Sequence, residues 1–278
     1  MSERKPLGGQ ALIEGVMIKA PDKVAMAARA PDGSIVSKCE DHVSLSQKYR
    51  ILSFPFLRGI VVLFEMLVIG IKAITWSANQ QGEEEELGPF EWFLTFSFAI
   101  ALTIFLFVLA PYYVSRLFFE QNTFAFAALD GALRLVVFLL YLALIGLMSD
   151  VRRMFEYHGA EHMAVHCYES GEKLTIKNVA KYPPEHPRCG TNLLFIVVMV
   201  SILLFSFIRF DHWYYNALAR ILLIPAVAGI SYEILKFSSK YRWLSWLAKP
   251  GIWVQKLTTR KPAGDQIEVA IRAVERAR

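Results

Sequence analysis

The segment Tyr157–Glu169, YHGAEHMAVHCYE, concentrates side chains that could bind a metal ion or move a proton. His158 and His162 are four residues apart, the spacing by which two imidazoles on one face of a helix bind one metal ion. Glu161 precedes the second histidine, so HGAEH has the H-x-x-E-H pattern of the inverzincin metalloproteases, in which the glutamate is the general base. The pattern predicts a metal site on a helix, with Glu161 as its catalytic residue.

A second set of ligand-type side chains follows in the proline-rich stretch YPPEHPRCGTN, where His186 and Cys189 are three residues apart. Prolines restrict the backbone and so reduce the entropy lost when a pair of ligands binds metal. His158, His162, His186 and Cys189 together form an N₃S set that suits Zn²⁺. Four protein ligands would make a closed structural site, whereas three ligands and a water would make a catalytic site with Glu161 as the base. The sequence leaves both alternatives open.

Two further residues of the first segment bear on this site. Glu169 falls on the His158 face of the predicted helix and is predicted to be a ligand or a hydrogen-bond acceptor for a ligand. His166 is rotated about 80° from His158 around the helix, which makes it a poor partner for the same ion. An alternative hypothesis needs no metal, because the histidines could instead donate hydrogen bonds to loop carbonyls where a buried helix meets a loop.

The composition indicates a membrane protein. The chain has 278 residues, 55% of them hydrophobic, and a mean hydropathy of +0.37, which is high for a soluble protein. Its cysteines, Cys39, Cys167 and Cys189, form no C-x-x-C pair, which argues against a disulfide framework and indicates a reducing compartment. The acidic run Glu83–Glu86 is predicted to be a solvated loop.

Four apolar stretches are long enough to cross a bilayer, which requires about 20 helical residues. A fifth stretch, Ile51–Trp76, carries Arg58, Glu65 and Lys72 at seven-residue intervals on one helical face. Because charges at membrane depth are costly, this stretch is predicted to be an interfacial or re-entrant helix, or one whose polar face is covered. The four predicted spans are Phe90–Tyr112, Gly131–Ser149, Thr191–Ile208 and Tyr215–Leu235.

The basic residues predict the orientation of these spans. Residues 1–50 hold eight Lys and Arg, residues 150–190 hold six, and the tail from Lys236 holds ten, whereas 113–130 and 209–214 hold one each. Basic residues mark the cytoplasmic side of a membrane protein. If Ile51–Trp76 does not cross, two spans separate the first two basic blocks and all three lie on one side. We therefore predict four spans with both termini in the cytoplasm.

The predicted fold is a mainly α integral membrane protein with a small cytoplasmic β-meander. Residues 8–43 contain short alternating runs separated by the turn signals APDK and APDGS, in which proline restricts one dihedral angle and glycine accepts positive φ. The C-terminal IEVAIRAVERAR has helical apolar spacing and is predicted to pack as an amphipathic helix on its own domain. The predicted organisation is a β-rich segment at 1–50, the interfacial helix at 51–76, a first transmembrane pair at 90–149, a cytoplasmic His/Cys-containing loop at 150–190, a second transmembrane pair at 191–235 and a basic cytoplasmic tail at 236–278.

Polar residues within the spans have both structural and functional interpretations. Asp130 and Arg134 are four residues apart, and an ion pair that stabilises the topology is favoured over a transport site. Pro225 and Gly229 interrupt the last span, and Glu233 follows one turn later. A broken helix near a carboxylate can line a cavity, although a simple kink explains the same pattern.

Four motifs extend from Gly8 to Pro262: GGQALIEGVMIKAP, YHGAEH with YE, HPRCGTN and KPGIWVQKLTTRKP. Together they resemble the YqhQ-like family of bacterial membrane proteins, whose members are often labelled predicted metal-dependent enzymes. The resemblance implies a location in the bacterial inner membrane, and it implies no substrate. Glu14, which has apolar neighbours and precedes Gly15, is expected to be buried and paired. The residues for which the resemblance implies a shared role are Gly9, Gln10, Glu14, Gly15, His158, Glu161, His162, His186 and Cys189.

Two functions follow from these observations. The first is a membrane-embedded zinc-dependent hydrolase whose site opens at the cytoplasmic membrane surface, with lipid headgroups or membrane peptides as substrates and Glu161 as the base. The second is a non-enzymatic membrane scaffold, or a factor associated with translocation or insertion, in which the His/Cys cluster is structural. Its basic face would bind anionic lipid, a membrane-protein partner or a ribosome at a translocon. The sequence contains no specific nucleic-acid motif and predicts no oligomeric state.

Overall fold

The computed structural model describes residues 6–82, 88–121 and 123–278 and is mainly helical, with one small sheet. The acidic run Glu83–Glu86 lies outside the described residues. The helices are α1 (Leu45–Lys48), the 3-10 helix η1 (Arg50–Ser53), α2 (Leu57–Gln80), α3 (Pro89–Ile104), the π-helix η2 (Phe105–Leu109), α4 (Ala110–Phe118), α5 (Phe124–Ile145), α6 (Ser149–Glu169), α7 (Ile176–Val179), α8 (Gly190–Ser206), α9 (Trp213–Leu222), α10 (Ile224–Lys240), the 3-10 helix η3 (Arg242–Ala248), α11 (Lys249–Thr258) and α12 (Gly264–Ala277).

The predicted β-meander is confirmed. Four strands pair in the order β1-β2-β3-β4, and every pair is antiparallel. The Pro-Asp-Gly signal forms the turn between the last two strands, where Gly33 has a φ of +84° that a Cβ would disfavour. The Ala30 N–H donates across this turn to the Ser34 carbonyl at 2.9 Å. The strands are β1 (Gly8–Leu12), β2 (Gly15–Lys19), β3 (Lys23–Arg29) and β4 (Ile35–Asp41).

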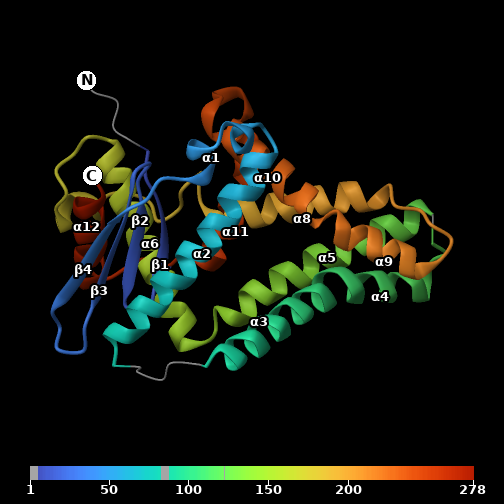
Figure 1. Cartoon of the computed structure of the whole chain (residues 1–278), viewed down its shortest axis with the longest axis horizontal. Helices are drawn as coiled ribbons and strands as arrows, with labels where there is room; N and C mark the ends of the chain where they lie inside the picture. Colours follow the sequence, from blue (N-terminus) through green and yellow to red (C-terminus); the bar gives the residue numbers. More distant parts are fainter. Residues whose placement is uncertain (1–5, 83–87, 122) are drawn as a thin grey trace.

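The sheet forms the middle layer of the compact end of the molecule (Figure 1). Side chains alternate along a strand, so Val16 and Ile18 of β2 pack in one core cluster with α6 and α12. Met17 points to the opposite face and packs with Ala73 of α2. The helix α12 therefore packs on its own domain, as the spacing of its apolar residues predicts. Within the basic segment 236–278, α11 contacts α8 and α12 contacts the sheet.

The helix α2 packs on the sheet and on α10 with much of its polar face covered. Arg58 forms an ion pair with Glu233 of α10. The carboxylate that follows the interruption of the last predicted span therefore has a structural partner. Glu65 is 7% exposed and accepts hydrogen bonds from the Ser44 hydroxyl and the Leu45 N–H, both at 2.5 Å. Arg58 and Glu65 therefore have polar partners, so these two charged residues can lie on a helix that also packs against apolar side chains.

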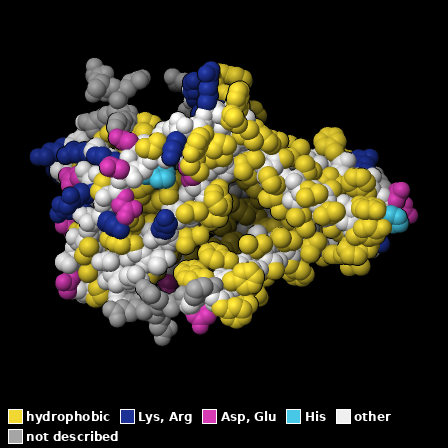
Figure 2. Space-filling view, viewed as in Figure 1, with side chains coloured by type: hydrophobic (Ala, Val, Ile, Leu, Met, Phe, Trp, Pro, Cys, Tyr) yellow, Lys and Arg dark blue, Asp and Glu magenta, His cyan; other side chains and the backbone are white. Residues whose placement is uncertain are grey.

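Two of the described helical segments are long and apolar enough to cross a membrane, Phe90–Phe118 and Phe124–Ile145. A third candidate is the pair α9 and α10, which is bent by 44° at the break before Pro225, a residue that cannot continue the preceding helix. The helix α8 is apolar but has 17 residues. The structure thus supports two spans, or three with the bent pair, where the sequence predicts four. Figure 2 shows apolar side chains over the long helices and charged side chains mainly over the sheet end.

Candidate metal centre

The helix α6 carries the first ligand-type residues. It ends at Glu169, and Gly171 follows with a φ of +83°, a conformation that glycine adopts readily at a helix end. His158 and His162 project from the same face, and their ring centroids are 4.4 Å apart. Gly159 lies between them, where a Cβ would overlap the Arg260 carbonyl. The helix therefore holds the two imidazoles side by side. Because Gly159 has no side chain, the segment after α11 can lie close to the backbone of α6.

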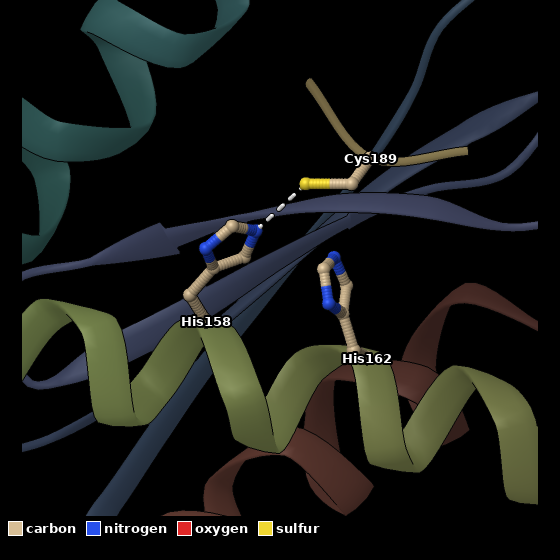
Figure 3. A group of neighbouring side chains, drawn as sticks. All are labelled: His158, His162 and Cys189. Carbon is tan, nitrogen blue, oxygen red and sulfur yellow. Dashed lines mark hydrogen bonds between the residues drawn. The ribbon is translucent and has the colours of Figure 1, made fainter. Parts of the chain in front are cut away.

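The proline-rich bend brings Cys189 to these histidines (Figure 3). Each of His158, His162 and Cys189 offers one ligand atom, and these atoms all lie within 4.8 Å of one another. His162 and Cys189 are buried, and His158 is half-buried. Cys189 is the N-cap of α8, and its sulfur accepts a hydrogen bond from the Thr191 N–H at 3.3 Å. The structure thus brings together ligand-type residues from the two segments.

Backbone carbonyls fix the orientation of both histidine rings. His158 Nδ1 donates to the Thr258 carbonyl at 2.9 Å, and His162 Nδ1 donates to the Pro184 carbonyl at 2.6 Å. In a neutral imidazole the other nitrogen then has a lone pair, and such a hydrogen bond is the usual support of a metal-bound histidine. The sequence-based alternative of histidines bound to loop carbonyls is therefore compatible with metal binding, because these bonds leave both Nε2 atoms free as ligands.

The atoms that face the two Nε2 positions are electron-rich. The Cys189 thiol donates a hydrogen bond to His158 Nε2 at 3.2 Å (Figure 3), and Glu161 Oε2 lies 3.4 Å from His162 Nε2. A divalent cation would take the place of the thiol proton, because a cysteine that binds a metal is deprotonated, and the lone pair of each Nε2 would then be available to the ion. Two imidazoles and a thiolate match the N and S ligands of zinc. The residues present therefore fit a zinc ion.

Glu161 is 3% exposed and lies against the first strand. Burial raises the pKa of its carboxyl group to about 7, although the nearby His158 and Arg188 oppose this shift. A Cβ on Gly9 of β1 would lie 2.6 Å from Glu161 Oε1, so a side chain there would displace the carboxylate. The first motif of the chain thus contributes a backbone surface to the environment of Glu161. A carboxyl group held in this way can accept a proton near neutral pH.

His186, which the sequence predicts as a ligand, lies outside the three-residue group. Its Nδ1 accepts a hydrogen bond from the Arg188 N–H at 3.2 Å, and its Nε2 lies 3.6 Å from Glu169 Oε2. Burial lowers the pKa of His186 to about 4. Burial alone would raise the pKa of Glu169, but the hydrogen bond from His186 and the positive charge of Arg188 outweigh it and lower that pKa. The backbone N–H of Arg188 occupies the Nδ1 lone pair of His186, and its Nε2 faces Glu169. His186 and Glu169 therefore form a polar contact of their own, separate from the three-residue group.

The last motif supplies supporting residues whose roles the sequence does not reveal. Gln255 is fully buried and binds both sides of the His186 backbone, accepting from its N–H at 2.8 Å and donating to its carbonyl at 2.9 Å. The Thr258 carbonyl orients His158, and the Thr258 hydroxyl lies 3.0 Å from the Thr191 hydroxyl. The only signal for these residues in the sequence is their position within KPGIWVQKLTTRKP. His166 donates to the Glu185 carbonyl at 2.9 Å and is not in the ligand group.

Two other predicted residues make contacts elsewhere in the fold. Glu14 forms an ion pair with Arg153 and accepts a hydrogen bond from the Tyr157 hydroxyl at 3.1 Å. The expected pairing of Glu14 is therefore confirmed, although its side chain is 21% exposed. The Gln10 amide lies over α2, where a Cβ on Gly70 would come within 2.5 Å of its oxygen. Both residues join the sheet to neighbouring helices.

Comparisons with known proteins match most of the chain. The model of a family described as "Protein of unknown function (DUF1385)" matches residues 54–278. The chain is 32% identical over 290 residues to "Uncharacterized protein YqhQ" of Bacillus subtilis (strain 168), an alignment that covers 95% of this chain and 89% of that relative. No solved structure matches the chain.

Proposed function

This chain belongs to the DUF1385 family, and from the geometry of its own side chains we propose that it is a zinc-dependent hydrolase of the bacterial inner membrane. The observation that carries the proposal is the convergence of His158, His162 and Cys189, with ligand atoms within 4.8 Å, beside the buried carboxyl group of Glu161. Three protein ligands leave one position of a tetrahedral zinc site open, as in catalytic sites. His186 points toward Glu169, which supports a site with three protein ligands and not four.

The residues around the ion have separate roles in this proposal. His158, His162 and Cys189 hold the zinc, which supplies Lewis-acid activation when bound. Glu161 accepts the proton of the attacking water, and the Gly9 backbone keeps its carboxylate beside His162. The Thr258 and Pro184 carbonyls keep the imidazoles in the tautomer that binds metal.

We propose that the site faces the cytoplasm at the membrane surface. The sheet, α6, α12 and the bend before α8 lie together at the charged end of the molecule, whereas the apolar helices extend away from it (Figures 1 and 2). In this arrangement α3–α4, α5, α8 and the bent pair α9–α10 make four spans, with both termini in the cytoplasm. Lipid headgroups or membrane peptides are then the substrates within reach. Reporter fusions test this topology, since a fusion after residue 120 should be exported and one after residue 278 should remain inside.

Metal analysis of protein purified in detergent is the first test of the site. About one equivalent of zinc is expected in the wild type and in Glu161→Gln, and far less in His158→Ala and Cys189→Ser. His166→Ala, which alters a neighbouring histidine outside the ligand group, is the matched control and should retain zinc. Loss of zinc in the control, or equal zinc in all variants, would contradict the proposed ligand set.

The reaction is tested with proteoliposomes of total inner-membrane lipid, in which released headgroups and peptides are measured by mass spectrometry. The wild type should release a product that Glu161→Gln does not, at equal zinc content, because removal of a general base typically lowers the rate by about 10²–10⁴-fold. Equal product from both proteins would refute the role of Glu161 as the base.

A second candidate function is a non-enzymatic scaffold, favoured by the number of segments that meet at the site. The residues around it come from α6, the bend before α8 and the end of α11, so a bound ion would fasten the sheet end to the apolar helices. Under this hypothesis Glu161→Gln has little effect, whereas His158→Ala destabilises the fold. Anionic lipid, or a ribosome at a translocon, would then be the partner of the basic face.

A further inference from the structure

A second group of charged residues lies within the apolar helices. Arg134 of α5 and Arg220 of α9 both contact Asp130, at 3.2 Å and 3.1 Å. All three side chains are at most 6% exposed. Among the described residues, Asp130 is the one carboxylate that pairs with either arginine. Two positive charges and one negative charge therefore leave a net charge of +1 inside the helices.

The hydrogen bonds of this group are also incomplete. Arg134 Nε and Arg220 Nε are buried and have no hydrogen-bond partner among the described residues. Both guanidinium groups lie over aromatic rings, Arg134 4.7 Å from the Phe205 centroid and Arg220 4.7 Å from the Tyr112 centroid. Such contacts lower the cost of a buried cation but add no negative charge. An uncompensated charge at this depth is costly, so the group favours an additional anion.

A cavity of about 550 Å³ adjoins this group between α3, η2, α5, α8 and α10. Its volume is within the range of small-molecule sites, about 300–1,000 Å³. Arg134 is the one described lining residue that carries a charge, and it donates to the hydroxyl of Ser201, which also lines the cavity, at 3.2 Å. Most of the remaining lining is aliphatic or aromatic, as at Val197, Phe205 and Ala228. The cavity thus has a long apolar wall and one cationic position.

We propose that this cavity binds an amphipathic lipid anion, whose acyl chain lies against the apolar wall and whose carboxylate or phosphate oxygens bind at Arg134. The charge count favours an anion, and the lining favours a chain over a small hydrophilic ion. A fatty acid and a lipid phosphate share this chemistry. None of the lining residues belongs to the candidate zinc site, so the inference does not depend on the proposed hydrolase activity.

The test compares three probes of similar chain length on the full-length protein in a neutral detergent: oleate, oleyl phosphate and uncharged monoolein. Native mass spectrometry and thermal unfolding measure binding. At least one anion should bind with a dissociation constant tenfold or more below that of monoolein, and the tighter anion identifies the headgroup. If monoolein binds as tightly as both anions, the cationic position has no role and the proposal is wrong.

Arg134→Met is the informative variant because it leaves Asp130 paired with Arg220, so the group becomes neutral and the fold should survive. Its affinity for the anion should fall tenfold or more, whereas its affinity for monoolein should not change. Arg116→Met, which removes an exposed arginine of α4 outside the lining, is the matched control and should bind like the wild type. Unchanged anion binding by Arg134→Met would overturn the proposal.

A second variant tests the cavity without changing the charges. Ala228→Leu adds a larger side chain to the wall, while Asp130, Arg134 and Arg220 remain as they are. Its affinity for the anion should also fall tenfold or more. If Ala228→Leu binds the anion like the wild type, the acyl chain does not occupy this cavity and the proposal is wrong, whether or not Arg134→Met folds.

Discussion

Replacement of Gly9 by alanine tests whether the first strand positions Glu161. A Cβ at this residue would lie 2.6 Å from Oε1 and 2.7 Å from Cδ and Cγ of Glu161. Because carbon atoms pack best at about 3.5–4.0 Å, the carboxylate would have to retreat by about 1 Å. Glu161 is 3% exposed, so this retreat displaces buried neighbours. Gly8, one residue earlier, provides the matched control, since a Cβ added there would meet no atom within 4 Å.

The expected cost of Gly9→Ala is that of overpacking a buried site, about 1–3 kcal/mol of unfolding free energy. A shift of this size at a catalytic group also predicts a rate about 10²-fold lower. Zinc content should be unchanged, because His158, His162 and Cys189 are not displaced directly. Thermal unfolding, zinc analysis and the proteoliposome assay measure these three quantities. If Gly9→Ala matches Gly8→Ala in both stability and rate, the strand does not position Glu161.

Three further changes have defined outcomes. Gln255→Leu leaves the buried His186 N–H unpaired, at a cost of about 1–3 kcal/mol, and leaves the His186 carbonyl with the Cys189 N–H as its donor. Because the same bend carries Cys189, zinc binding should weaken about 10-fold or more in chelator competition. Asp130→Asn leaves two buried guanidinium groups without a counter-charge and should destabilise the protein by about 3–5 kcal/mol, measurably more than Arg134→Met does in the same thermal unfolding assay. Removal of zinc with a chelator should lower the unfolding temperature of the wild type but leave that of His158→Ala unchanged.

Local patterns in the sequence predicted several elements that the structure contains. The Pro-Asp-Gly turn and the alternating runs around it form the meander, because proline and glycine limit the backbone before any tertiary contact exists. The four-residue spacing of Asp130 and Arg134 places them in contact on one helix. His158 and His162 share a face of α6 for the same reason. These results depend only on neighbours a few residues apart.

The composition of the candidate zinc site was less predictable. The prolines and spacing of HPRC suggested that His186 and Cys189 bind together, yet the Arg188 N–H occupies His186 Nδ1. The His186 ring lies 5.6 Å from that of His162, centroid to centroid, but the ligand group contains Cys189 and not His186. The support from Gln255 and the Thr258 carbonyl comes from a helix far along the chain. Side-chain rotation and backbone hydrogen bonds decide such contacts, and a ligand pattern carries little information about either.

The sequence by itself determined the local elements of this protein, the division into apolar helices and a charged end, and the residue types able to bind zinc, because hydropathy, turn chemistry and helical spacing act over short distances. Only the tertiary structure decided that Gly9 faces Glu161, that Arg220 adds a second positive charge beside Asp130, and that the Arg188 N–H occupies His186 Nδ1. The physical reason is that these contacts join segments far apart in the chain. Their geometry depends on how the sheet and helices pack around each side chain.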